Sequence, residues 1–206
     1  MQPQILLDKL TLAELIKYFQ EKLIEEITDT RLQHSYRVAE IARELANRHG
    51  YPQNPERAYL AGLLHDISKQ KTKEFHEELF VASGKETYLS LPINVYHAFS
   101  GPLYVHKQYH WQDEEIFLAM QNHTLGSEKA SLLEEILYVA DFLGSAYAQK
   151  QKEYPDWLEK AKVSLAFGCY LKSSQTIADL LHKKLAIHPR TIHTYHHAIA
   201  RLSTRA

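Results

Sequence analysis

The most informative residues of the chain are an adjacent histidine and aspartate, His65 and Asp66, which follow the apolar run 61–64. A charged carboxylate at the end of an apolar helix costs free energy unless a cation or several hydrogen-bond donors compensate it. The negative carbonyl end of a helix attracts cationic side chains, which would account for His65 and for Lys69. Asp66 has the wrong sign for that position, so it indicates a cation-binding site.

Two further polar residues lie on apolar faces of predicted helices. His34 shares a helical face with Val38, and Asp141 shares one with Leu137. Taken alone, His34 could be a buried histidine whose hydrogen bonds are satisfied. Asp141 could belong to a buried salt bridge, but residues 130–149 contain no basic side chain, so its partner would have to be remote in sequence.

Two histidines and two aspartates together form a set of nitrogen and oxygen ligands, namely His34, His65, Asp66 and Asp141. Without a thiolate, such a set suits iron, manganese or zinc better than copper. A metal ion held in this way keeps coordination positions for water and for a phosphate oxygen. It lowers the pKa of the water and neutralises charge on the phosphoryl group. The residues therefore predict metal-assisted hydrolysis of a phosphate compound.

Other histidines give weaker signals. His97 and His123 each lie near a predicted helix end, where surface capping is the commoner role, but at a phosphate site they could donate hydrogen bonds or move protons. His193, His196 and His197 have a spacing that can bind a metal ion. Because that segment is polar, terminal and without a nearby carboxylate, we expect it to form a solvated or partner-facing helix.

The composition excludes several classes of protein. The chain has 206 residues, with 24 basic and 25 acidic side chains, so its charge gives no indication of nucleic-acid or membrane binding. Its one cysteine excludes an internal disulfide and a cysteine-rich zinc site. The amphipathic N-terminus does not resemble a signal peptide, and no apolar run is long enough to cross a membrane. We expect a cytoplasmic protein, for which a homodimer is possible.

The elements that must position these side chains are predicted to be helices, because apolar residues recur at helical spacing almost throughout. Thr11 and Glu14 form a capping box, and Gly50 ends the second helix. A loop is expected at 83–91, and no strand pattern or internal repeat is strong. We therefore predict an all-α fold in one domain. The expected helices are 11–27, 31–49, 54–69, 73–82, 92–109 with an interruption at Gly101-Pro102, 113–122, 131–142, 156–186 as one helix or two separated near Gly168, and 191–201.

In this order and spacing, His34, His65-Asp66 and Asp141 resemble the signature of HD-domain phosphohydrolases. The surrounding residues look more specifically like the YqeK-like branch, the symmetrical diadenosine tetraphosphate hydrolases (bis(5'-nucleosyl)-tetraphosphatases) of bacteria. The resemblance implies an HD-domain helical bundle over residues 1–206, with an HD core at about 28–145 and a C-terminal helical extension at about 155–206. The matching stretches are 31–35, 61–69, 97–98 before Gly101, 123–124 before Gly126, 138–141 and 187–191.

The same resemblance implies a reaction and a site. Diadenosine tetraphosphate would be hydrolysed to two ADP with bound iron, for which Mn²⁺ or another divalent metal could substitute. The implied metal ligands are His34, His65, Asp66 and Asp141. The implied catalytic residues are Asp66, Lys69 and His97. The implied contacts to the nucleotide phosphates are Arg31, Asp66, Lys69, His97, His123, Thr124 and Leu125.

Three segments depart from the family pattern. The usual Pro-Val-Gly after His97 is Phe99-Ser100-Gly101 here, and the usual His-Thr-Thr turn is His123-Thr124-Leu125. After the late aspartate the family usually has Tyr/Lys-Ile-Glu-Pro-Gly-Arg, whereas residues 142–147 here lack that arginine and that acidic residue. The metal ligands are unaffected, so the changes concern the substrate. Two alternatives therefore stay open: another HD nucleotide phosphohydrolase, such as a nucleoside monophosphatase, and a regulatory module that binds a metal or nucleotide with weak or no activity.

Overall fold

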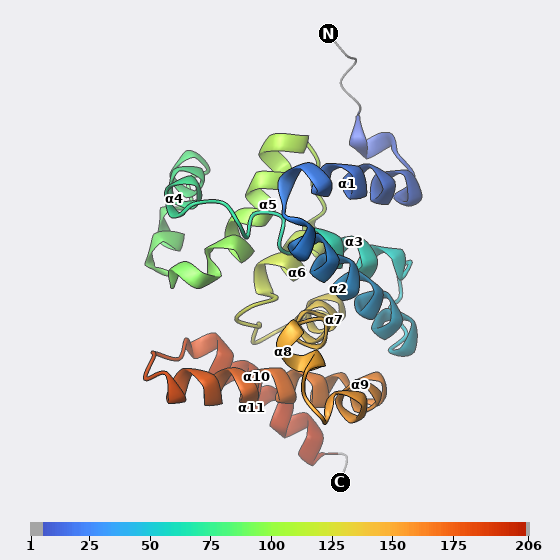
Figure 1. Cartoon of the computed structure of the whole chain (residues 1–206), viewed down its shortest axis with the longest axis vertical. Helices are drawn as coiled ribbons and strands as arrows, with labels where there is room; N and C mark the ends of the chain where they lie inside the picture. Colours follow the sequence, from blue (N-terminus) through green and yellow to red (C-terminus); the bar gives the residue numbers. More distant parts are fainter. Residues whose placement is uncertain (1–5, 205–206) are drawn as a thin grey trace.

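The computed structural model describes residues 6–204, and these residues form eleven α-helices, three 3₁₀-helices and no strand (Figure 1). The predicted all-α class is confirmed. Residues 1–5 and 205–206 of the predicted domain lie outside the described residues. The α-helices are α1 (Leu12–Glu26), α2 (Asp29–Arg48), α3 (Glu56–Leu64), α4 (Lys73–Ala82), α5 (Tyr96–Tyr109), α6 (Glu114–Asn122), α7 (Leu132–Leu143), α8 (Ala146–Gln149), α9 (Tyr154–Val163), α10 (Leu165–His182) and α11 (Pro189–Ser203). The 3₁₀-helices are η1 (Leu7–Lys9), η2 (Glu86–Ser90) and η3 (Ile93–Val95).

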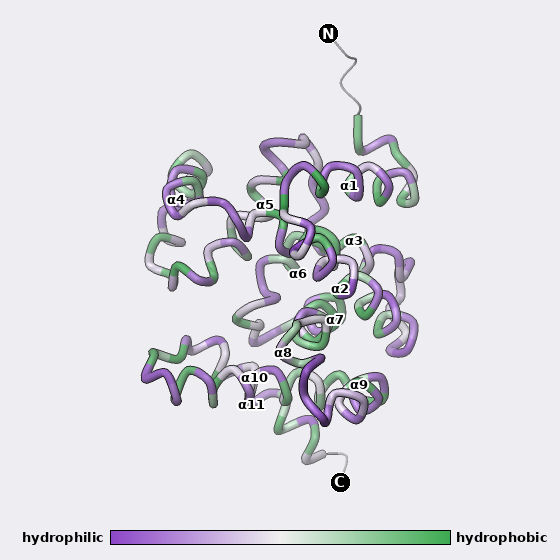
Figure 2. The backbone as a smooth tube through the Cα atoms, viewed as in Figure 1, coloured by the Kyte–Doolittle hydropathy of each residue, from purple (hydrophilic) through white to green (hydrophobic). Residues whose placement is uncertain are grey.

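Helix α7 lies in the middle of the molecule, between the body formed by α1–α6 and a layer formed by α9–α11 (Figure 1). It packs against α2, α3, α6 and α10. Hydrophobic residues gather around α3 and α7, while longer hydrophilic stretches lie on the outer helices (Figure 2). Such burial on nearly every side explains why any polar residue of α7 must find a partner inside the protein.

The local signals for helix ends were largely reliable. Thr11 and Glu14 form the predicted capping box at the start of α1, and Ser131 forms a second box with Glu134 at the start of α7. Helix α4 has the predicted limits, and Gly50 follows α2 with a φ of 65°, which a glycine adopts at little cost. The predicted loop 83–91 contains the short helix η2.

Helix α3 is shorter than predicted, because it ends at Leu64 rather than near Lys69. The following residues form tight turns, in which the Lys69 N–H donates to the carbonyl of Asp66 at 2.9 Å. Ser68 donates to the backbone carbonyl of His97 at 3.1 Å, and this contact with α5 is not visible in the sequence. His65, Asp66 and Lys69 therefore leave from the end of α3 and from the turns that follow it.

Two predicted helix breaks were wrong or misplaced. Helix α5 continues through Gly101-Pro102, although a proline inside a helix costs about 3 kcal/mol. Both residues are buried, so packing in the core outweighs the local preference. The long C-terminal helix divides at Ser164 instead of near Gly168, and the Ser164 hydroxyl caps α10 by accepting the Phe167 N–H at 3.2 Å.

Gly62 allows the close approach of α3 and α2, and we expect Gly62→Ala to lower the free energy of unfolding by about 1–3 kcal/mol. A Cβ at this position would lie 2.5 Å from the Cα of Ala39, a backbone atom that no side-chain rotation can move. Urea denaturation of the metal-free protein measures the effect. Gly101→Ala is the control, since its Cβ would meet side-chain atoms and no backbone, with the end of the flexible Met120 side chain nearest at 3.3 Å. Equal stability of the two variants would contradict the steric explanation.

None of the helices in the part of the chain that the structure describes combines the length and hydrophobicity needed to span a bilayer.

Candidate metal centre

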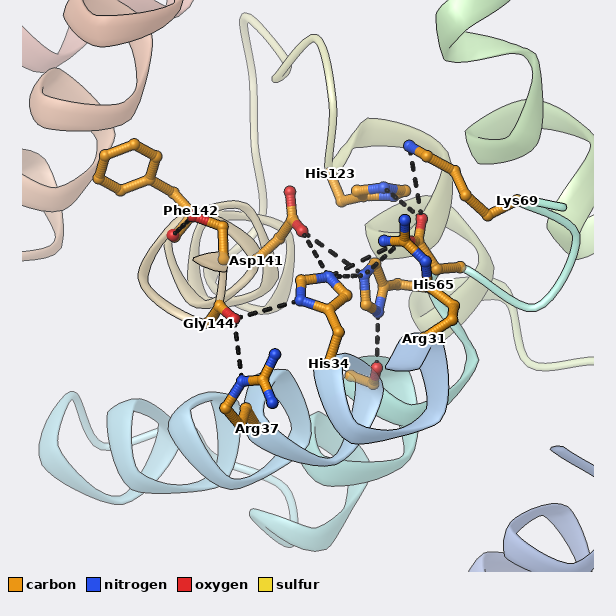
Figure 3. A network of polar contacts seen from close by, with 12 residues as sticks. Arg31, His34, Arg37, His65, Lys69, His123, Asp141, Phe142 and Gly144 are labelled. Atoms are coloured by element: carbon orange, nitrogen blue, oxygen red, sulfur yellow. Dashed lines mark hydrogen bonds and ion pairs between the residues drawn. The ribbon is translucent and has the colours of Figure 1, made fainter. Parts of the chain in front are cut away.

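The four predicted metal ligands converge from three parts of the fold, and Figure 3 shows His34, His65 and Asp141 among them. His34 comes from α2, His65 and Asp66 from the end of α3 and the turn after it, and Asp141 from α7. The His34 Nε2 atom lies 3.3 Å from Asp141 Oδ1 and 3.8 Å from Asp66 Oδ2. The His65 Nε2 atom lies 3.5 Å from each of the same two oxygens. Sequence periodicity therefore identified side chains that are neighbours in space.

Backbone carbonyls orient both imidazoles. His34 Nδ1 lies 3.2 Å from the carbonyl oxygen of Gly144, and His65 Nδ1 lies 2.6 Å from that of Gly62. A carbonyl can only accept, so each Nδ1 carries the proton and donates it. The two Nε2 atoms, 3.3 Å apart, then face the carboxylates, which is the orientation that metal-ligating histidines adopt.

Asp66 also faces a second group, formed by His97 and His123. Its Oδ1 atom lies 3.3 Å from His97 Nε2 and 3.6 Å from His123 Nε2. The His123 Nδ1–H donates to the Met120 carbonyl at 2.6 Å. Both imidazoles are almost completely buried, so the commoner role as surface caps is wrong for them. Asp66 thus lies between two histidine groups, each of which could hold a cation.

The chemistry of this donor set fits a divalent cation. Asp66 Oδ1 is buried and accepts no hydrogen bond from the residues that the structure describes. Carboxylate oxygens and imidazole nitrogens with lone pairs crowd together here, and only a proton or a metal ion relieves their repulsion. Iron, manganese and zinc all accept this combination of ligands.

The pKa shifts of the buried side chains also indicate that this centre attracts a cation. Burial lowers the pKa of His65, but the carboxylates of Asp66 and Asp141 outweigh it and raise that pKa to about 9. Burial acts to raise the pKa of Asp66, yet the charge of His65 holds it well below the ordinary value. The centre therefore keeps its carboxylates ionised and attracts a positive charge, which a metal ion supplies when it displaces the proton.

Two cationic side chains lie at the more exposed edge of the centre. Arg31 Nη1 donates to Asp66 Oδ2 at 2.8 Å, and Lys69 Nζ donates to His97 Nε2 at 2.8 Å. Each side chain is 32% exposed, so each can reach both the buried aspartate and a ligand arriving from solvent.

Thr124 and Leu125 lie in the turn after α6, and their side chains have different surroundings. Thr124 Oγ1 is buried and has no hydrogen-bond partner among the described residues. The Leu125 side chain packs in an apolar cluster with Phe80 and Phe99. Leu125 therefore has only its backbone to offer a phosphate. Gly126 adopts a φ of 76° where the turn packs against α11.

Sequence reasoning missed Lys172, which is the remote partner of Asp141. The Lys172 Nζ atom donates to Asp141 Oδ2 at 2.7 Å, so Asp141 takes part both in a buried salt bridge and in the histidine cluster. A signal was present, because Lys172 shares a face of α10 with the buried residues Leu165 and Cys169. A lysine on an apolar helical face is as unusual as His34 or Asp141 on such a face, so the same criterion could have identified Lys172.

The C-terminal histidines do not join the centre. His193, His196 and His197 are exposed on α11, as expected for a solvated helix. Within residues 6–204, the groups with metal-ligand spacing are the two that share Asp66, and neither includes a residue of α11. His188 instead caps α11 by accepting the Arg190 N–H.

Comparisons with known proteins agree with this centre. The family model of the HD domain matches residues 31–144. The chain is 32% identical to a symmetrical bis(5'-nucleosyl)-tetraphosphatase of Halalkalibacterium halodurans, over 82% of this chain and 89% of the relative. It is 30% identical to the Bacillus subtilis protein of the same name, over 83% and 90% of the two chains.

A solved structure shares the fold. It is described as a predicted HD superfamily hydrolase involved in NAD metabolism from Clostridium acetobutylicum, and it superimposes with a TM-score of 0.78 at 26% identity. The match covers 90% of this chain and 97% of the other. The family match, the relatives and the convergent histidines and aspartates lead to one conclusion: this chain belongs to the HD-domain family, in the branch of the symmetrical bis(5'-nucleosyl)-tetraphosphatases.

Proposed function

We propose that this protein hydrolyses diadenosine tetraphosphate symmetrically to two ADP, using a metal ion held by His34, His65, Asp66 and Asp141. The observation that carries the proposal is the convergence of two carbonyl-oriented Nε2 atoms on two carboxylates. The names of the relatives supply the substrate.

We further propose iron as the metal, with Mn²⁺ or another divalent ion able to substitute, because the ligands are imidazoles and carboxylates only. When bound, the ion supplies Lewis acidity and lowers the pKa of water. His34 and His65 contribute neutral nitrogens, while Asp66 and Asp141 contribute negative charge. The group of Asp66, His97 and His123 offers the same two kinds of ligand, with one carboxylate in place of two, so elemental analysis decides whether it holds a second ion or faces a phosphate.

The remaining residues of the centre have roles that follow from charge and exposure. Arg31 and Lys69 bind the polyphosphate, and Lys69 neutralises negative charge on the departing ADP. Burial holds the pKa of His97 well below its ordinary value, so this imidazole stays neutral and keeps Lys69 in place by accepting a hydrogen bond from its ammonium group. His123, Thr124 and the backbone of Leu125 complete the phosphate-binding side.

The domain organisation that we propose has an HD core at about 28–145 and a C-terminal extension at about 155–206. The range of the family match and the packing of α9–α11 as a layer beneath α7 support this division (Figure 1).

Product analysis tests the activity. The purified protein, with Fe²⁺ or Mn²⁺, is incubated with diadenosine tetraphosphate, and nucleotides are separated by anion-exchange chromatography. We expect ADP as the sole product, and no product after treatment with a chelator. ATP together with AMP would contradict symmetrical cleavage. Orthophosphate released from a nucleoside monophosphate would support the alternative phosphohydrolase, and metal binding without turnover of either substrate would support the regulatory module.

A further inference from the structure

Lys172 reaches the metal centre from α10, outside the segment that matches the HD-family model. Its side chain is 7% exposed. The Nζ atom donates to Asp141 Oδ2 and to the His123 carbonyl, each at 2.7 Å, and it lies 4.3 Å from the centre of the Tyr138 ring. An ammonium group has three donors, so two hydrogen bonds and a cation–π contact account for all of them. These three contacts therefore fix the position of the Lys172 ammonium group.

The two oxygens of Asp141 consequently have different surroundings. Oδ2 accepts from Lys172, whereas Oδ1 lies 3.3 Å from His34 Nε2 and 3.5 Å from His65 Nε2. The lysine thus occupies one oxygen and leaves the other to the imidazoles. A carboxylate without such a partner could turn about its Cβ–Cγ bond and offer both oxygens to a cation.

We propose that Lys172 is a positioning residue of the metal centre, which holds Asp141 so that Oδ1 alone binds the cation. This inference rests on the proposed metal site. Lys172 acts through Asp141 and contacts neither the other ligands' side chains nor the exposed edge where Arg31 and Lys69 lie. Groups that orient metal ligands in this way typically change metal affinity or activity by about 10–100-fold when they are removed.

The same lysine connects the centre to the C-terminal layer. Besides the bond from Lys172 to the His123 carbonyl, the Arg190 side chain donates to the Gly126 carbonyl at 3.1 Å. Thr191 donates to the carbonyl of Leu125 at 3.4 Å. Helices α10 and α11 therefore hold both a metal ligand and the turn beside it, which makes the C-terminal extension part of the site.

The test measures Mn²⁺ binding to chelator-treated protein by isothermal titration calorimetry, independently of activity. Lys172→Met keeps the length of the side chain but removes its charge and donors. We expect its dissociation constant for Mn²⁺ to rise about 10–100-fold, and Lys172→Arg to restore most of the affinity. Lys183→Met is the control at the end of the same helix, because Lys183 is exposed and pairs only with Asp179; it should bind Mn²⁺ like the unchanged protein.

A double-mutant cycle separates positioning from general stabilisation. If Lys172 acts through Asp141, adding Lys172→Met to Asp141→Asn causes no further loss of Mn²⁺ affinity. An equal loss in both backgrounds would overturn the proposal, as would unchanged binding by Lys172→Met alone. If Lys172→Met fails to fold, the double variant can be used instead, because it leaves neither charge unpaired. Comparison of its Mn²⁺ affinity with that of Asp141→Asn then tests the proposal. Absence of Mn²⁺ binding by the unchanged protein would instead refute the metal site itself.

Discussion

Asp66→Ala is expected to abolish both metal retention and the hydrolysis of diadenosine tetraphosphate. Among residues 6–204, Asp66 is the acidic residue that the two histidine groups share, with Oδ2 toward His65 and Oδ1 toward His97 and His123. Its removal leaves a buried cluster of imidazoles with Asp141 as the remaining carboxylate. Loss of the ion removes several kcal/mol of transition-state stabilisation, which corresponds to a rate at least about a thousandfold lower.

The measurement combines elemental analysis of the purified variant with the rate of ADP release. The double variant His196→Ala/His197→Ala is the control, because it removes two exposed histidines of α11 that lie outside the centre. It should retain the metal and the full rate. If Asp66→Ala keeps both its metal content and its activity, the assignment of the ligands is wrong. Loss of activity in the control variant would indicate that the C-terminal histidines contribute to the site.

Lys69→Ala should separate metal binding from catalysis, since we expect it to keep the metal and to lose about 10²–10³-fold in kcat. Lys69 Nζ lies 3.8 Å from Asp66 Oδ1, beyond hydrogen-bond distance, whereas Arg31 donates to Asp66 Oδ2 at 2.8 Å, so the carboxylate keeps its hydrogen bond when Lys69 is removed. Its charge instead stands at the more exposed edge, where negative charge accumulates on the departing ADP. Removal of that charge raises the barrier for the transition state more than it weakens binding of the substrate.

Lys71→Ala is a matched control for this variant. Lys71 is two residues away and 29% exposed, against 32% for Lys69, but its ammonium pairs with Glu26 at 2.8 Å, outside the centre. We expect it to leave kcat and metal content unchanged. Steady-state kinetics at saturating Mn²⁺, with metal analysis of the same preparations, checks both variants. Loss of metal from Lys69→Ala would contradict its role at the phosphates.

Much of the fold followed from local signals. A capping residue such as Thr11 satisfies the first backbone N–H groups of a helix, and this is a contact within a few residues. For the same reason the limits of α4 were predicted correctly. The prediction for Gly101-Pro102 was wrong because long-range packing of α5 outweighs the local cost of a proline. Helix α3 ends at Leu64, earlier than predicted, and the turns that follow it bring Ser68 into contact with α5.

The sequence by itself identified the side chains that we propose as metal ligands. His34 and Asp141 interrupt apolar helical faces, so the helical period of 3.6 residues was enough to direct them inward. Asp66 was identified differently, because its charge has the wrong sign for a helix end. Only the tertiary structure decided how these side chains are held. Helical periodicity says which way a residue faces but not which distant residue it meets. The pairing of Asp141 with Lys172 depends on how α10 packs against α7, and the orientation of the His34 imidazole depends on the position of the Gly144 carbonyl.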